Sequence, residues 1–244
     1  MASNTNKSLK NKVIYSVYVR NHSESGDFKG VMKDLDRIKL LGVDYIWFMP
    51  IHPIGEVNKK GELGCPYSIS DYRAVNPEYG TMEDFKELVS AIHEKGMKCM
   101  IDVVYNHTSH ESVLSKEHPE FFYKKPDGRF GNKVGDWTDV IDLDYTNKDL
   151  WDYQLETLKM WAKIVDGFRC DVASLVPIEF WNRARKEVAE VNPDCLWLAE
   201  SVEYGLIKYA RDTGFNCLSD SELYQAFDIL YDYDVYPKYL ADRK

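Results

Sequence analysis

The 244-residue sequence has no apolar run long enough to cross a membrane, and its first residues, 1–8, lack the apolar core of a signal peptide. It also lacks an excess of positive charge, because 31 Lys and Arg stand against 40 Asp and Glu, for a formal net charge of −9. This charge would repel a polyanionic partner. We therefore expect neither a membrane anchor nor binding to nucleic acid.

Cysteine is scarce as well. The sequence has only five cysteines, an odd number, and all but Cys65 fall in or beside apolar stretches typical of strands. These four are Cys99, Cys170, Cys195 and Cys217. Their placement favours buried thiols over disulfide bonds. Free thiols and the absence of a signal peptide both predict a cytoplasmic protein.

No glycine-rich phosphate loop follows the first predicted strand, which disfavours a nucleotide-binding sheet. What the sequence does contain is 44% hydrophobic residues, arranged as strands that alternate with amphipathic helices. The predicted strands lie at 13–20, 43–50, 97–105, within 165–174, at 196–199 and at 215–218. The predicted helices lie at about 27–41, 81–95, 147–162, 177–192, 206–211 and 224–231.

This alternation predicts an α/β fold with a parallel sheet and right-handed crossovers. Polar residues of catalytic type follow several strands, which favours a (β/α)8 TIM barrel, whose active sites lie at the carboxyl ends of the strands. The count gives about six β/α units, whereas a closed barrel needs eight. We therefore predict a barrel that is truncated after about six units.

Two carboxylates are candidates for catalysis. Alternation along 165–174 places Arg169 and Asp171 on one face, and an arginine so close should keep the Asp171 carboxylate ionised, as a nucleophile requires. Glu200 ends the apolar run 196–199, a setting that raises a carboxyl pKa. Such a pair suits retaining glycoside hydrolysis. From spacing alone, Asp171 could equally be a structural partner of Arg169, and Glu200 a helix N-terminal acid.

Three segments, 102–107 (Asp-Val-Val-Tyr-Asn-His), 165–174 and 196–201, resemble the conserved regions of the α-amylase family, glycoside hydrolase family thirteen, in the family's order. The segment 64–72 extends the resemblance, which covers roughly Lys12 to Asp220. It implies an α-amylase-type TIM barrel formed by 1–107 and 145–244. It also implies that 108–144 forms a small lid domain inserted after the third strand.

The resemblance further implies that Asp171 is the nucleophile and Glu200 the acid/base catalyst. The implied substrate-binding residues are Tyr67, Asp102, His107 and Arg169. In this interpretation Tyr67 stacks on a sugar ring, His107 bonds sugar hydroxyls and Asp102 braces the site. Without the resemblance, these three would be interpreted as an ordinary loop tyrosine, a capping histidine and a turn aspartate.

The sequence departs from the family in two places. Asn106 matches a calcium-binding position of many relatives, but Leu175 stands where those relatives supply a histidine, and Ser174 stands where lysine is common. We therefore expect no metal and no cofactor, with calcium at Asn106 as the open alternative. The family's third acid follows a histidine on strand seven, and this sequence has no histidine after His118. Without that acid, we expect these residues alone to be a poor catalyst.

Together these features predict a retaining α-amylase-type glycosidase that cleaves α-glucosidic bonds of starch- or maltodextrin-like glucans by double displacement. One alternative is a truncated or noncatalytic family member that binds glucan or a partner chain, which the intact Asp171 and Glu200 disfavour. Another is a metal-dependent barrel hydrolase with Asp102 and His107 as ligands. His52 and His110 are poorly placed to complete such a site.

Overall fold

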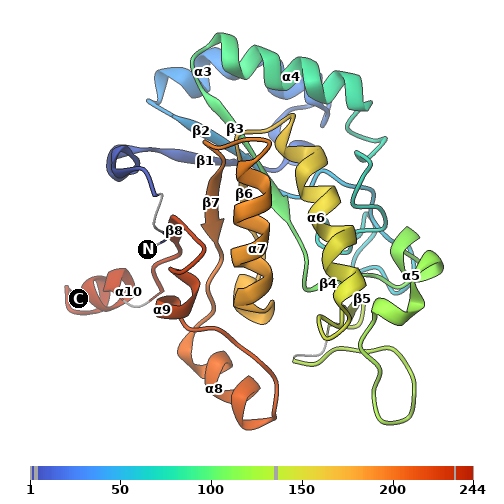
Figure 1. Cartoon of the computed structure of the whole chain (residues 1–244). Helices are drawn as coiled ribbons and strands as arrows, with labels where there is room; N and C mark the ends of the chain where they lie inside the picture. The colour runs from blue at the N-terminus through green and yellow to red at the C-terminus, as the bar shows by residue number, and fades with distance from the viewer. Residues whose placement is uncertain (1, 3–4, 135–136, 234, 244) are drawn as a thin grey trace.

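The computed structural model describes residues 2, 5–134, 137–233 and 235–243. Six strands form one parallel sheet in the order β1-β2-β3-β6-β7-β8, as Figure 1 shows. Their bounds are β1 (Ile14–Val17), β2 (Tyr45–Phe48), β3 (Lys98–Val103), β6 (Gly167–Cys170), β7 (Leu196–Ala199) and β8 (Ile229–Leu230). Among the described residues β1 and β8 are not paired with each other, so the sheet is an open arc. The predicted number and direction of strands are confirmed.

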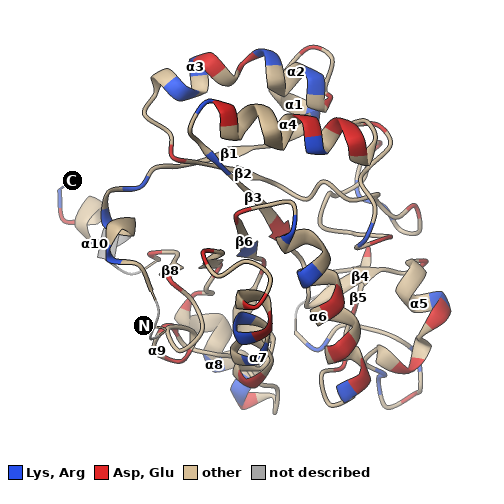
Figure 2. Ribbon diagram, turned by 45° about the horizontal axis from the view of Figure 1, so that its top comes forward, with Lys and Arg blue, Asp and Glu red and all other residues tan. Residues whose placement is uncertain are grey.

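Helices cover the outer face of this sheet and connect its strands. Those that follow strands of the sheet are α1 (Val19–His22), α2 (Phe28–Lys33), α3 (Leu35–Leu40), α4 (Met82–Glu94), η3 (Ala173–Leu175), α7 (Ile178–Ala189), α8 (Tyr204–Asp212), α9 (Asp220–Leu223) and α10 (Val235–Ala241). The short helix η1 (Lys7–Asn11) precedes β1. Charges of both signs are interspersed along the outer helices (Figure 2). In the part of the chain that is described, no helix has both the length and the apolar character needed to cross a membrane.

The predicted lid segment 108–144, together with His107 just before it, contains a second, two-stranded antiparallel sheet. It consists of β4 (His107–Ser109) and β5 (Val140–Asp142), with α5 (Val113–Glu117) and η2 (Pro119–Phe121) between them. The helix α6 (Lys148–Ala162) then leads back to the main sheet. Gly135 and Asp136 of the predicted lid lie outside the described residues. That 108–144 is a separate domain stays a prediction.

Alternation along the strands gives the sheet two different faces. Phe168 and Cys170 of β6 pack outward into the large core beneath the helices. Met100 of β3 and Leu198 of β7 belong instead to a smaller cluster on the inner face. On this face there is no room for a side chain at Gly167, since a Cβ atom there would lie 2.9 Å from the Leu196 carbonyl oxygen. The inner face is therefore where the polar side chains of the strands meet.

The sixth strand lies elsewhere than predicted. The segment 215–218 was expected to be a strand and 224–231 a helix, and both expectations are wrong. Cys217 packs in a small satellite cluster with Leu175 and Ile207, and the Leu218 N–H donates to the Ser174 carbonyl, so this segment joins no strand. The strand is instead β8, only two residues long, which pairs with β7. A strand of two residues is too short to show the alternation of apolar and polar residues by which strands are predicted.

Two further details differ from the predicted elements. The helix expected at 27–41 is divided into α2 and α3 at Asp34, whose backbone leaves the helical region with φ −100° and ψ 0°. The structure also contains a short helix that is not among the predicted ones, α9, which begins at Asp220. By contrast, α4 forms where the helix at about 81–95 is predicted, and Thr81 and Asp84 form a capping box at its start. Local signals of this kind depend only on neighbouring residues.

Candidate active site

Strand register brings Asp102 and Arg169 together. They are direct partners across β3 and β6, and both side chains point to the inner face. The Arg169 Nη1 donates to the two Asp102 carboxyl oxygens at 2.9 and 3.1 Å. Asp102 is fully buried and also accepts hydrogen bonds from Trp47 Nε1 at 3.2 Å and from the Tyr67 hydroxyl at 3.4 Å. Asp102 thus fixes the position of the arginine.

Asp171 and Glu200 occupy matching places on neighbouring strands. Cys170 pairs with Ala199 across β6 and β7, and the two acids come directly after this pair. Parallel strands carry both carboxyl groups to the same end of the sheet. Their backbone amides continue the ladder, since the Asp171 N–H donates to the Val103 carbonyl and the Glu200 N–H to the Cys170 carbonyl, both at 2.9 Å. The acids are thus anchored by the sheet rather than by a free loop.

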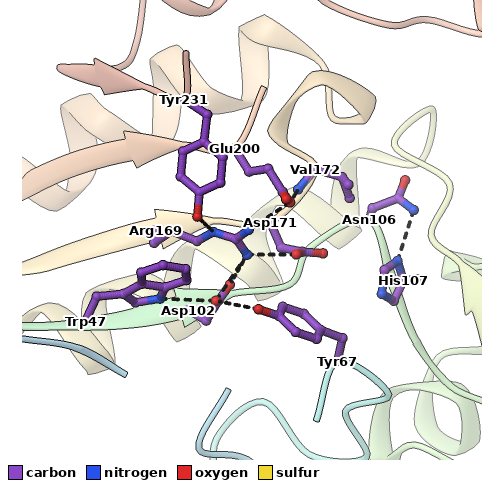
Figure 3. Close-up of polar contacts among 10 residues, drawn as sticks. All are labelled: Trp47, Tyr67, Asp102, Asn106, His107, Arg169, Asp171, Val172, Glu200 and Tyr231. Carbon is purple, nitrogen blue, oxygen red and sulfur yellow. Dashed lines mark hydrogen bonds and ion pairs between the residues drawn. The ribbon is translucent and has the colours of Figure 1, made fainter. Parts of the chain in front are cut away.

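A single guanidinium joins all three acids (Figure 3). Besides Asp102, Arg169 binds Asp171 Oδ1 through Nη1 at 2.8 Å and Glu200 Oε2 through Nη2 at 2.9 Å. The carboxyl groups of Asp171 and Glu200 are also close enough that each affects the pKa of the other. The two candidate catalytic carboxyl groups therefore lie beside each other, on Nη1 and Nη2 of one guanidinium.

Aromatic rings enclose the guanidinium. The Arg169 Cζ atom lies 4.9 Å from the ring centroid of Trp47, 5.4 Å from that of Tyr231 and 5.8 Å from that of Tyr67. Its Nε also donates to the Tyr231 hydroxyl at 3.2 Å. Such contacts attract a cation to the ring faces and exclude water from it. Arg169 is consequently held in one orientation toward the acids.

Burial raises the carboxyl pKa of Asp171 and of Glu200 above its ordinary value. The nearby charge of Asp171 raises the pKa of Glu200 further, and Arg169 opposes the rise in both acids. The rise for Glu200 is as predicted. For Asp171 the predicted direction is wrong: Arg169 does lower its pKa, but desolvation outweighs this contribution. One cation facing three acids, of which Asp102 and Asp171 are buried and Glu200 is partly buried, favours keeping a proton within the cluster, as a general acid requires.

A cavity of about 390 Å³ opens at this cluster. His107 and Tyr67 line it beside Asp171, Arg169 and Glu200. The other lining residues are Lys60, Cys65, Trp137, Asp139, Val140 and Val172. His107 is buried, and its ring lies 5.5 Å from that of Trp137. Burial lowers the pKa of His107, which favours its neutral form, able both to donate and to accept a hydrogen bond.

Of the sequence-predicted site residues, Asp102 alone does not line this cavity but lies behind it, holding Arg169. Asn106, the open calcium position, lies beside His107, to whose Nδ1 its Nδ2 comes within 3.2 Å. The fold therefore brings all six predicted residues into one region, three from the ends of β6 and β7, and Asp102, His107 and Tyr67 from β3, β4 and the loop after β2.

Sequence reasoning missed several contributors. Trp47 and Tyr231 face Arg169 from β2 and from just after β8, and Trp137 forms a wall of the cavity. Alternation in β2 could have indicated Trp47, since it shares a face with Tyr45. Val172 has a left-handed backbone, with φ 35°, which β-branched residues rarely adopt, and its N–H donates to Glu200 Oε2 at 2.9 Å. No sequence signal announces this turn.

Comparisons with known proteins agree on one family. The family model of the α-amylase catalytic domain matches residues 6–139. Alpha-amylase 3 of Dictyoglomus thermophilum is 31% identical over 238 residues, which cover 83% of this chain and 46% of that protein. The oligo-1,6-glucosidase of Parageobacillus thermoglucosidasius is 31% identical over 205 residues, covering 68% and 35%. The chain thus spans less than half the length of these two curated relatives.

Solved structures give the same result. An alpha-amylase from Lactobacillus plantarum superposes with a TM-score of 0.93 at 60% sequence identity, and the match covers 95% of this chain and 55% of that one. A noncanonic maltogenic alpha-amylase from Thermotoga neapolitana superposes with a TM-score of 0.82 at 39% identity, covering 95% and 51%. The open arc of six strands therefore corresponds to about half of each of these chains.

Proposed function

Because this chain belongs to the α-amylase family, we propose that the protein containing it is a retaining glycosidase of α-glucans. The observation that carries the proposal is the pair Asp171 and Glu200, which come from adjacent strand ends and share the guanidinium of Arg169. Double displacement uses two neighbouring acids, of which one attacks as a carboxylate and the other holds a proton. The relatives include alpha-amylases and oligo-1,6-glucosidases, which supports starch- or maltodextrin-like substrates.

In the proposed mechanism, the Asp171 carboxylate attacks the anomeric carbon while Glu200 donates a proton to the leaving glycosidic oxygen. Glu200, now ionised, then takes a proton from water, which attacks the same carbon and releases Asp171. Arg169 balances the charge that shifts between the two acids in these steps. His107 and Tyr67 face the cavity, where they can bind hydroxyl groups and a ring face of the sugar.

The stereochemistry of the first product tests this proposal. The protein is expected to release the α anomer from maltotetraose, because two displacements at one carbon restore its configuration. Proton NMR spectra taken within the first minutes, before mutarotation, distinguish the anomers. Initial release of the β anomer would contradict the mechanism, and glucan binding without any product would favour the noncatalytic alternative.

We also propose that the protein resides in the cytoplasm. All five cysteines are free thiols, and four of them are buried. Free thiols persist in reducing compartments, which supports this assignment. Immunodetection in fractions of the source cells tests it, with recovery in the extracellular or periplasmic fraction as the result that would contradict it.

A further inference from the structure

Asp142, the last residue of β5, lies at the junction between the predicted lid and the barrel. Its side chain is buried, and both of its oxygens accept hydrogen bonds from nitrogen donors. Oδ1 accepts from Asn106 Nδ2 at 3.3 Å and from Asn132 Nδ2 at 3.2 Å, and Oδ2 accepts from the Lys133 backbone N–H at 2.7 Å. The carboxylate therefore faces N–H groups in this arrangement.

The side chain of Lys133 returns to the same junction. Its Nζ donates to the Leu143 carbonyl at 2.9 Å, directly after Asp142. The residue as a whole is only partly buried, but its ammonium group lies deep enough that desolvation lowers its pKa, while Asp142 and Asp144 oppose this effect. A buried ammonium needs such carboxylates close by.

This junction contains Asn106, which matches a calcium-binding position of many relatives. One feature would suit a metal, because the buried Asn106 Oδ1 has no hydrogen-bond partner. Calcium, however, takes six to eight oxygen ligands. The Asp142 oxygens are already engaged by N–H donors, and the adjacent cavity of about 490 Å³ is lined by Lys133, Lys148 and Leu175 as well as by Asn106, Asp142 and Asp144. Among the described residues no group of three or more His, Cys, Asp or Glu could hold a metal ion. The residues present do not fit calcium.

We propose that the ammonium group of Lys133 takes the structural place of a divalent cation at this junction, so that the protein neither needs nor binds calcium there. The ammonium lies near enough to Asp142 and Asp144 for their charges to raise its pKa, and it bonds to the chain between them. On the barrel side, the Leu143 N–H donates to the Asn106 carbonyl at 2.9 Å. The junction thereby holds the β4–β5 pair, which carries His107 to the catalytic cavity.

The unmodified protein provides the first test. Its melting temperature, followed by near-ultraviolet circular dichroism, is expected to change by less than about 1 °C on addition of EDTA or of millimolar CaCl₂. Terbium luminescence, excited through nearby aromatic rings, is expected to show no binding that calcium displaces. Stabilisation by calcium of more than about 2 °C, or calcium-displaceable terbium, would overturn the proposal.

Variants of the lysine provide the second test. Lys133→Met is expected to lower the melting temperature by about 4 °C or more, because Asp142 and Asp144 lose their cation. Lys133→Arg keeps the positive charge and should therefore lower the melting temperature less than Lys133→Met does. The matched control is Lys116→Met, which replaces an exposed lysine of α5 in the same insertion and should shift the melting temperature by less than about 1 °C. Equal effects of the Met variants would refute the role of Lys133. If Lys133→Met does not fold, the chelation results and Lys133→Arg decide.

Discussion

Replacing Asp171 by asparagine is expected to lower kcat on an aryl α-maltoside by about 10⁴- to 10⁶-fold, the loss typical of removing a nucleophile from a group of residues that act as a unit. The amide keeps the size of the side chain but cannot attack the anomeric carbon. Initial rates of aryl alcohol release measure the effect. The matched control is Asp127→Asn, an exposed aspartate of the lid segment paired with Arg129, which should leave kcat unchanged.

Glu200→Gln separates the roles of the two acids. Its loss should be smaller, about 10²- to 10⁴-fold, as for removal of a general acid or base. For substrates whose leaving group needs no proton, the loss of kcat in Glu200→Gln should be smaller still. The loss of kcat in Asp171→Asn should not depend on the leaving group in this way. If instead the kcat loss of Asp171→Asn shrinks with such leaving groups and that of Glu200→Gln does not, the assigned roles of the two acids are reversed.

Replacing Arg169 by leucine is expected to lower the free energy of unfolding by about 3–5 kcal/mol, the cost of removing one partner from a buried ion pair. Asp102 is fully buried and Asp171 nearly so, and both would lose the cation that each contacts within 3 Å. Urea denaturation at pH 7 measures the difference. The loss should be smaller at lower pH, because protonated carboxyl groups no longer need the guanidinium.

The control for this variant is Arg183→Leu on α7, whose ion pairs with Asp152 and Glu187 are partly exposed. Pairs of this kind contribute about 0–1 kcal/mol. Arg169→Lys should restore little, because an ammonium group cannot serve three carboxylates with the fixed geometry of a guanidinium. Equal unfolding free energies for the Arg169→Leu and Arg183→Leu proteins would show that the acid cluster does not depend on Arg169.

Several features of this protein were predictable from local sequence. The period of two along β6 placed Arg169 and Asp171 on the same side, and their side chains do contact each other. Strand β7 has the predicted bounds, Leu196–Ala199, because an apolar run of that length between polar residues has few alternatives. By contrast, β8 is defined only by its pairing with β7, and pairing partners far apart in the chain leave no local pattern.

The sequence by itself determined that the two candidate acids, Asp171 and Glu200, follow the ends of neighbouring strands. Only the tertiary structure decided that one guanidinium serves three carboxylates, because this depends on the register between β3, β6 and β7. It also decided the direction of the Asp171 pKa shift. A neighbouring arginine can be read from the chain, but desolvation depends on every atom packed around the carboxyl group, and here it outweighs the arginine.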